Sequence, residues 1–258
     1  MTERQLAEEA AREAGALVRE ACGRPMEISE KAVPTDLVTE MDRAAEALII
    51  KRLSTVYPEY GFLAEESPSL AGAEEVRWII DPIDGTKNYA HAYPAFGISI
   101  ALERAKRIVL GVVYLPMLDE LFVAEEGLGA TLNGARISVS TVDSLGRGLL
   151  TSGYPYNVWE ADNDNSQPWN RLLKRAGGLR RSGSTAVDLC YVACGRVDGY
   201  WEPGLAAWDV AGGAIIVKEA GGLVTDYLGE SNYVYGQQLV ASNARIHDEM
   251  LSLIREPQ

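Results

Sequence analysis

The spacing of apolar residues predicts two amphipathic helices near the start of the chain. Over residues 3–21, apolar positions recur among charged ones at the spacing of one helix face. A second helix is expected from about Thr39, because Asp42 follows three residues later in the pattern of a capping box. Apolar residues continue at helical spacing after that cap.

Short apolar runs replace this helical pattern in the next part of the chain. Such runs are typical of strands, and Pro116 and Gly127 mark turns between the later ones. We therefore expect strands over residues 61–64, 76–80, 97–102, 109–114 and 120–124.

Beyond about Ser140 the pattern changes again, to strands that alternate with helices. Residues 154–169 are rich in Asn, Asp and Pro, and we interpret them as a loop at the rim of the functional site. Around this loop, strands are expected over residues 149–152, 197–201 and 239–242, and helices over residues 185–194, 206–220 and from about 244 onward.

These patterns predict an α/β protein built from two subdomains. Residues 1–140 are expected to form an α+β N-terminal part, and residues 141–258 an α/β C-terminal part. At 258 residues with 47% hydrophobic content, the chain is long enough to bury a substantial core as one large domain or two packed ones. Clefts between packed units are common binding places, so we expect the site between the two parts.

The formal charge of −13 restricts the choice of partner. It argues against binding of nucleic-acid phosphates, which depends on clustered Lys and Arg. An anionic substrate would also be repelled unless bound cations reversed the local field, and this favours a metal site. Because the chain has only two histidines, His91 and His247, we expect oxygen ligands, which suit Mg²⁺ or Ca²⁺.

The three cysteines indicate neither a disulfide framework nor a zinc site, since they are odd in number and lack a Cys-x-x-Cys spacing. Cys190 and Cys194 are expected in the core on a helix. No window approaches the roughly 18 apolar residues of a membrane span. The N-terminus also lacks the apolar centre of a secretory signal. We therefore expect a cytoplasmic protein without a membrane partner.

An apolar strand that runs into an acidic turn carries the strongest chemical signal. In residues 78–89, the turn Asp-Pro-Ile-Asp-Gly places Asp81 and Asp84 close together. Gly85 lets the backbone approach a bound group, and a helix beginning after it would direct free N–H groups at a phosphate. The alternative is an ordinary surface turn, because Asp, Pro and Gly are common turn formers.

Two further carboxylate positions favour chemistry over a surface turn. Glu65 and Glu66 follow the apolar run 61–64, and Asp209 lies in the first turn of the expected helix 206–220. Alone, the glutamates would be a solvated pair, and the aspartate would complement the helix dipole. Their joint occurrence with the acidic turn favours a metal site.

Together these motifs resemble the inositol monophosphatase family of metal-dependent phosphatases, over nearly the whole chain. Ala64 stands where glycine is usual and Tyr89 where phenylalanine is usual, and neither change removes a ligand. The resemblance implies the layered αβαβα sandwich of the sugar phosphatase fold. The similar segments are Ala64-Glu65-Glu66, residues 78–89, Glu202-Pro203-Gly204 and residues 208–212, with Lys31, residues 36–42 and residues 181–186.

The resemblance also implies roles for individual residues. Thr86 and Asp42 would activate the attacking water with the help of Glu65, although Asp42 could instead serve only as a helix cap. Glu202 could likewise be an ordinary strand-end charge. Two or three Mg²⁺ ions would be bound by Glu65, Asp81, the carbonyl of Ile83, Asp84 and Asp209. The implied substrate contacts are Asp84, Gly85, Thr86, Ala186, Glu202 and Asp209.

Hydrolysis of a small phosphate monoester by metal-activated water is the activity that the resemblance implies. We rank inositol monophosphate first, with fructose 1,6-bisphosphate, histidinol phosphate or another sugar phosphate as alternatives. The resemblance also implies a homodimer. Two other classes of function stay open, a non-catalytic regulatory homologue and a calcium-stabilised interaction domain. The complete acidic set argues against the first, and its few ligands argue against the second.

Overall fold

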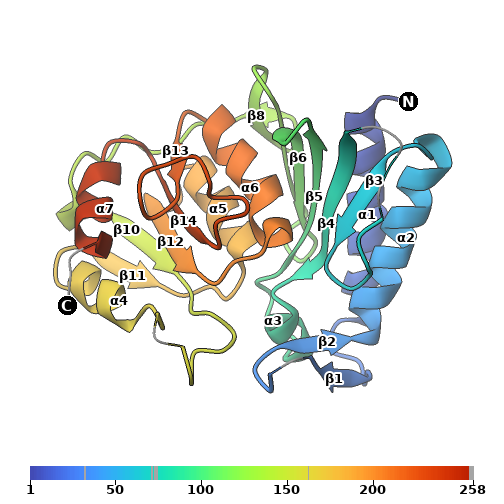
Figure 1. The fold of residues 1–258 in the computed structure, drawn as a ribbon, viewed down its shortest axis with the longest axis horizontal. Coiled ribbons are helices and arrows are strands. Elements are labelled where there is room, and N and C mark those ends of the chain that lie inside the picture. The colour runs from blue at the N-terminus through green and yellow to red at the C-terminus, as the bar shows by residue number, and fades with distance from the viewer. Residues whose placement is uncertain (32, 71, 73–74, 162, 256–258) are drawn as a thin grey trace.

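Five layers of secondary structure stack across the molecule (Figure 1). The computed structural model describes residues 1–31, 33–70, 72, 75–161 and 163–255. In Figure 1 two helices lie on the right, followed by a seven-stranded sheet, a second pair of helices, a five-stranded sheet and a third pair of helices. This order confirms the αβαβα sandwich that the resemblance implied.

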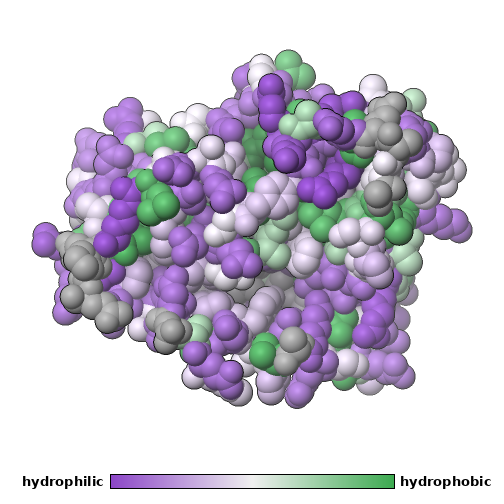
Figure 2. Space-filling view, viewed as in Figure 1, coloured by the Kyte–Doolittle hydropathy of each residue, from purple (hydrophilic) through white to green (hydrophobic). Residues whose placement is uncertain are grey.

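Helices α1 (Glu3–Ala21) and α2 (Glu40–Val56) form the first layer and confirm the two helices expected from apolar spacing. Thr2 and Thr39 cap them, and each cap is a complete capping box. Polar residues cover most of the molecular face seen in Figure 2, whereas the inner faces of these helices are apolar.

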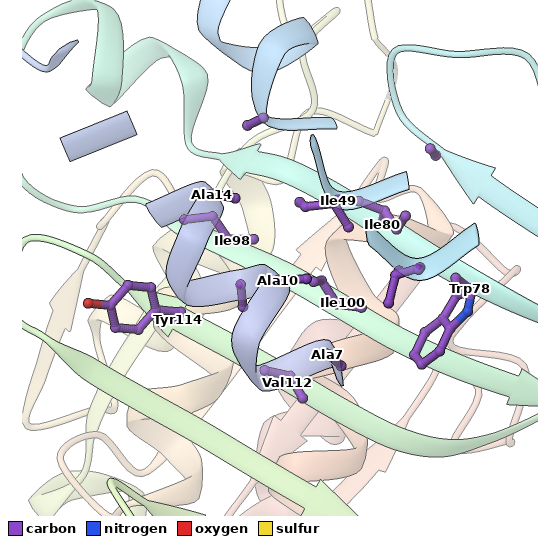
Figure 3. Close-up of a cluster of buried hydrophobic side chains, with 14 of the residues drawn as sticks. Ala7, Ala10, Ala14, Ile49, Trp78, Ile80, Ile98, Ile100, Val112 and Tyr114 are labelled. Carbon is purple, nitrogen blue, oxygen red and sulfur yellow. The ribbon is translucent and has the colours of Figure 1, made fainter. Parts of the chain in front are cut away.

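Small helix residues face large strand residues in the core between this layer and the first sheet (Figure 3). The alanines of α1 let the helix lie close to the strands. Gly15 extends this stripe, because a methyl group there would overlap the ring of Tyr114. The core side chains labelled in Figure 3 are Ala7, Ala10 and Ala14 of α1, Ile49 of α2, and Trp78, Ile80, Ile98, Ile100, Val112 and Tyr114 of the sheet.

The seven-stranded sheet has the order β3-β4-β5-β6-β7-β8-β9. β3 and β4 are parallel, and the other neighbours are antiparallel. All five strands expected before residue 140 are present, and β8 and β9 are additional. In sheet order the strands cover Gly61–Ala64, Val76–Asp84, Gly97–Arg104, Arg107–Leu115, Glu120–Glu125, Gly129–Leu132 and Ala135–Arg136.

Helices α5 (Thr185–Ala193) and α6 (Ala207–Glu219) form the middle layer. α6 is apolar on almost every side because it packs against the first sheet on one face and against α5 on another. A methyl group at Gly111 of β6 would overlap the carbonyl oxygen of Gly212 in α6, so helix and sheet backbones nearly touch. This close approach fixes the depth at which α6 lies on the sheet.

The five-stranded sheet has the order β11-β10-β12-β14-β13, and α4 (Ser166–Leu173) and α7 (His247–Arg255) cover its outer face. β10 is parallel to β11 and β12, whereas β14 is antiparallel to β12 and β13. In sheet order its strands cover Gly178–Arg180, Leu149–Ser152, Gly199–Pro203, Gln238–Ser242 and Leu223–Thr225.

Three small elements complete the described chain. The hairpin of β1 (Ile28–Glu30) and β2 (Leu37–Thr39) precedes α2, and α3 (Thr86–Ala90) follows β4. A short 3₁₀ helix covers Leu145–Arg147. None of the helices in the described ranges is long and apolar enough to cross a membrane.

The structure corrects four expected boundaries. β4 continues through the supposed acidic turn to Asp84, because β5 keeps pairing with it across a register shift. The expected loop 154–169, of which residue 162 is not described, ends early because α4 begins at Ser166. The sequence pattern does not predict α4, because the segment directly before it is rich in Asn and Asp. β12 starts two residues later than expected, and α7 begins at His247 rather than near 244.

The cysteines partly follow expectation. Cys190 is buried in α5, as predicted. Cys194 lies one residue beyond the helix, at its C-cap, and is only half-buried. All three cysteines are free, which agrees with the absence of a disulfide framework.

Gly111→Ala should lower the free energy of unfolding by about 1–3 kcal/mol, because the new methyl group forces α6 away from the sheet. Urea unfolding measures this change. Gly146→Ala is the matched control, since a methyl group there meets only an ordinary contact at 3.7 Å. Equal stability of the two variants would contradict a tight contact between α6 and β6.

Stability should also depend on pH through His247. Burial lowers the pKa of His247 to about 4 from an ordinary 6.5, and its ring nitrogens bond Thr225 and Ser242 at 2.9 Å. Protonation therefore favours the unfolded chain, so this contribution is full above pH 6.5 and is lost as the pH falls toward 4. In urea unfolding from pH 7 to 4.5, wild type should lose stability more steeply than His247→Asn. Parallel pH profiles would contradict this.

Candidate metal and phosphate site

Two aspartates meet at the carboxyl end of β4. The register shift between β4 and β5 falls between Asp81 and Asp84, and it turns both side chains into the interior. Asp81 is 1% exposed and Asp84 is 7% exposed. Asp81 Oδ1 accepts a hydrogen bond from the Ile83 N–H at 3.1 Å, which leaves its other oxygen available to a ligand.

Asp209 joins this pair from the middle layer. It lies in the first turn of α6, where its Oδ2 accepts the Ala206 N–H at 2.7 Å. One carboxylate oxygen each from Asp81, Asp84 and Asp209 lies within 4.8 Å of the other two. Asp209 therefore lies where it complements the dipole of α6, the alternative drawn from the sequence, and it also belongs to the acidic cluster.

The electrostatics of this cluster are unfavourable without a cation. Burial raises the pKa of Asp81 well above its usual range, and the charges of its acidic neighbours raise it further. Burial raises the pKa of Asp84 to about 6, and burial also raises that of Asp209. Because three hard oxygen donors converge in a low-dielectric space, the site fits a divalent cation such as Mg²⁺ or Ca²⁺.

Glu65 approaches the cluster from β3 but is held by a lysine. Lys31 Nζ contacts Glu65 Oε1 at 2.7 Å and Glu66 Oε1 at 2.5 Å. Burial raises the pKa of Glu65 to about 7, and Lys31 opposes this shift. The buried Glu46 of α2 accepts the Glu66 N–H at 2.8 Å and so fixes the backbone beside Glu65. Glu65 is not one of the three clustered carboxylates.

Thr86 and Asp42 are brought together from α3 and α2. Thr86 Oγ1 lies 2.9 Å from Asp42 Oδ1 and 3.0 Å from the carbonyl oxygen of Ile83, so its single proton can go to either. Asp42 Oδ2 accepts the Thr39 N–H at 2.8 Å. The capping role of Asp42 and its contact with Thr86 therefore occur together, through different oxygens.

Asp84 is also held by the N-terminal end of α5. The Ser184 hydroxyl and the Ala186 N–H both donate to Asp84 Oδ2, the latter at 2.6 Å. The Ala186 N–H is thus engaged with Asp84 in this structure. Gly85, at φ 97°, precedes α3, and a methyl group there would be crowded by the Ala95 carbonyl oxygen and Ser184 Cβ.

The pocket beside the cluster is lined by the rim loop and β12. Its lining includes Glu202 of β12, Asp84, Asp209, Tyr154 and Tyr156. Burial raises the pKa of Glu202 to about 8. A neighbouring cavity of about 330 Å³ shares both tyrosines and is lined also by Lys87. Residues 154–156 and 158, in the first part of the expected rim loop, therefore lie at these cavities.

Sequence reasoning assigned no role to several residues that complete the site. Ser184 and Lys31 were recognised only as parts of similar segments. Tyr200, whose hydroxyl lies 2.6 Å from Glu202 Oε2, was overlooked. Its position two residues before Glu202 on a strand was a usable signal, because such residues share one face.

A sequence profile of the inositol monophosphatase family matches residues 2–257. The chain belongs to this family. Family membership supports a phosphatase, and the cluster of Asp81, Asp84 and Asp209 fits metal binding. The resemblance drawn from the motifs alone is therefore confirmed.

Relatives from bacteria carry two kinds of name. The inositol-1-monophosphatase of Synechocystis sp. is 43% identical over 247 residues, 95% of this chain and 86% of that protein. Nus factor SuhB of Escherichia coli (strain K12) is 41% identical over 254 residues, 97% of this chain and 95% of that protein. The solved inositol monophosphatase of Anabaena is 40% identical, with a TM-score of 0.88 over 97% of this chain and 94% of that one.

Asp81→Asn should remove the stabilisation that a divalent cation confers on this family member, without weakening the metal-free protein. Asn keeps an acceptor for the Ile83 N–H but removes one of three clustered charges. At a cation concentration 100 times Kd, wild type should gain about 2.7 kcal/mol in free energy of unfolding, and the variant far less. Urea unfolding in EDTA, then in Mg²⁺ or Ca²⁺, measures both. A full gain in the variant would exclude Asp81 as a ligand.

Proposed function

We propose that this protein is a magnesium-dependent phosphomonoesterase that hydrolyses inositol monophosphate or a related polyol or sugar phosphate. One observation carries the proposal, namely the convergence of Asp81, Asp84 and Asp209 in a chain that belongs to the inositol monophosphatase family. Buried carboxylates that repel one another suit a site that binds cations and, through them, a phosphate dianion.

The residues that would hold the metal are those named from the resemblance. Asp81, Asp84 and Asp209 supply the clustered oxygens, with Glu65 and the Ile83 carbonyl beside them. When bound, two or three Mg²⁺ ions would neutralise the ester and lower the pKa of a coordinated water. Glu65 would first exchange its contact with Lys31 for the ion.

Thr86 and Asp42 would accept the proton that the attacking water loses. When the Thr86 hydroxyl donates to Asp42, its oxygen lone pairs are free to accept a hydrogen bond from water. As the water oxygen bonds to phosphorus and the bond from phosphorus to the ester oxygen breaks, one water proton would pass to Thr86 and the hydroxyl proton to Asp42. The leaving alkoxide would take its proton from solvent water. Burial raises the pKa of Asp42, which makes it a better proton acceptor.

The leaving alcohol would be recognised on the other side of the cluster. Glu202 and the loop before α5 line this part of the pocket and offer oxygen and N–H groups to hydroxyls. Asp84, Gly85, Thr86, Ala186 and Asp209 would complete the contacts. Fructose 1,6-bisphosphate and histidinol phosphate remain alternative substrates, and the homodimer and cytoplasmic location stay predictions.

A regulatory function is the second candidate, because relatives 41% identical to this chain carry the name Nus factor SuhB. The complete acidic cluster argues against loss of catalysis, since a silent homologue has no need for buried like charges. The net charge of −13 argues against direct binding of nucleic-acid phosphates.

Phosphate release from a panel of phosphate esters, with and without Mg²⁺, tests the proposal. We expect Mg²⁺-dependent release, highest for inositol monophosphate, and a loss of at least 100-fold in kcat for Asp84→Asn. Asp226→Asn is a matched control, because Asp226 is equally buried at 7% exposure and also accepts backbone N–H groups, on the turn after β13.

Equal kcat values for wild type and Asp84→Asn would exclude Asp84 from the mechanism. No phosphate release from any ester of the panel, with Mg²⁺ present, would contradict the enzyme and favour the regulatory candidate. Release that is equal with EDTA and with Mg²⁺ would contradict metal dependence.

A further inference from the structure

A buried tyrosine lies directly behind the polyol side of the pocket. Tyr200 is 0% exposed in β12, and its hydroxyl oxygen is 2.6 Å from Glu202 Oε2 and 2.9 Å from Thr185 Oγ1. Tyr200 and Glu202 are two residues apart on one strand, so their side chains leave the same face of the sheet.

The direction of these hydrogen bonds follows from proton counting. The Tyr200 hydroxyl donates its single proton to Glu202 Oε2, an oxygen that accepts whether the carboxyl is ionised or carries its proton on Oε1. The Tyr200 oxygen is then free to accept the Thr185 proton. The result is a directed chain from Thr185 through Tyr200 to Glu202, which holds one carboxylate oxygen and leaves the other to the pocket.

Glu202 is also in contact with the backbone at Gly153, directly before the rim loop. A methyl group at Gly153 would overlap the Glu202 carboxylate, so the carboxylate packs against bare backbone there. Asn165 Nδ2 donates to the Gly153 carbonyl at 2.6 Å, and Asn165 Oδ1 accepts from Trp201 Nε1 at 2.8 Å. With Gly153 fixed by Asn165, Tyr200 adds the hydrogen bond that orients the Glu202 carboxylate.

We propose that Tyr200 is a positioning residue that aims the free oxygen of Glu202 at hydroxyl groups of the leaving alcohol and thereby sets the preference for polyol esters. The inference rests on the proposed function. Thr185 opens α5 directly after Ser184, which donates to Asp84. Tyr200 therefore also links the alcohol side of the pocket to the loop that supports the acidic cluster.

The test compares two esters that differ in hydroxyl groups. kcat and KM are measured with Mg²⁺ for inositol 1-phosphate and for phenyl phosphate, whose leaving group has no further hydroxyl. In Tyr200→Phe, the ratio of kcat/KM values, inositol ester over phenyl ester, should fall about tenfold, mainly through a higher KM for the inositol ester. A tenfold fall corresponds to about 1.4 kcal/mol, the net size of one hydrogen bond within a protein.

Tyr227→Phe is the matched control. Tyr227 is also buried, and its hydroxyl has no hydrogen-bond partner among the described residues. Removal of that oxygen should leave the ratio unchanged. Glu202→Gln should lower the ratio at least as far as Tyr200→Phe, and the double variant should fall no further than Glu202→Gln, because Tyr200 acts only through Glu202.

The possible outcomes separate this inference from the proposed function. If wild type releases phosphate from neither ester, the proposed function fails. If wild type prefers the inositol ester but Tyr200→Phe keeps the ratio, or lowers kcat for both esters equally, the positioning role is overturned. An unchanged ratio in Glu202→Gln would overturn it as well, whatever the folding of Tyr200→Phe.

Discussion

Repulsion between buried carboxylates is the constraint on which the structure of this site depends. Asp81, Asp84 and Asp209 approach within 4.8 Å of one another in an environment that penalises negative charge. Such an arrangement costs folding free energy unless the groups bind protons or cations. Lys31 pairs with the neighbouring Glu65 and Glu66, and none of the three clustered aspartates has a lysine or arginine partner in the described part of the chain. The cluster is therefore a poor structural element and a suitable cation site, in line with the family to which the chain belongs.

Tight packing between α6 and β6, one helical turn from Asp209, holds the cluster in place. α6 is apolar on almost every side and lies against β6 at Gly111, where only hydrogen fits between the two backbones. That contact determines how deeply the first turn of α6, with Asp209, reaches toward the end of β4. The register shift at Asp81 and Asp84 turns the strand end to meet it. The contact at Gly111 and the register shift in β4 thus bring Asp209 to Asp81 and Asp84, which lie more than 120 positions earlier in the chain.

The two sides of the pocket are built differently. On the side that we propose for the phosphate, three carboxyl groups converge in a space that fits a cation. On the side that we propose for the alcohol, the partners are neutral groups. The Tyr200 hydroxyl bonds Glu202, and the Asn165 amide bonds the backbone at Gly153. Relatives with similar chains are named both as inositol monophosphatase and as Nus factor SuhB. The alcohol side, rather than the shared acidic cluster, is where differences of substrate preference are expected.

Sequence alone determined most helices and strands and the acidic motifs, because periodicity, capping boxes and turn residues are local properties. It placed α1 and α2 and the carboxylates at Asp81, Asp84 and Asp209. It missed α4 behind a polar segment and mistook the bulged end of β4 for a turn. Only the tertiary structure decided that Lys31 neutralises Glu65, that Ser184 supports Asp84 and that Tyr200 holds Glu202 against Gly153. Nearly all of these contacts join segments distant in sequence, so they depend on how the layers pack. The local pattern of residues along the chain does not determine that packing.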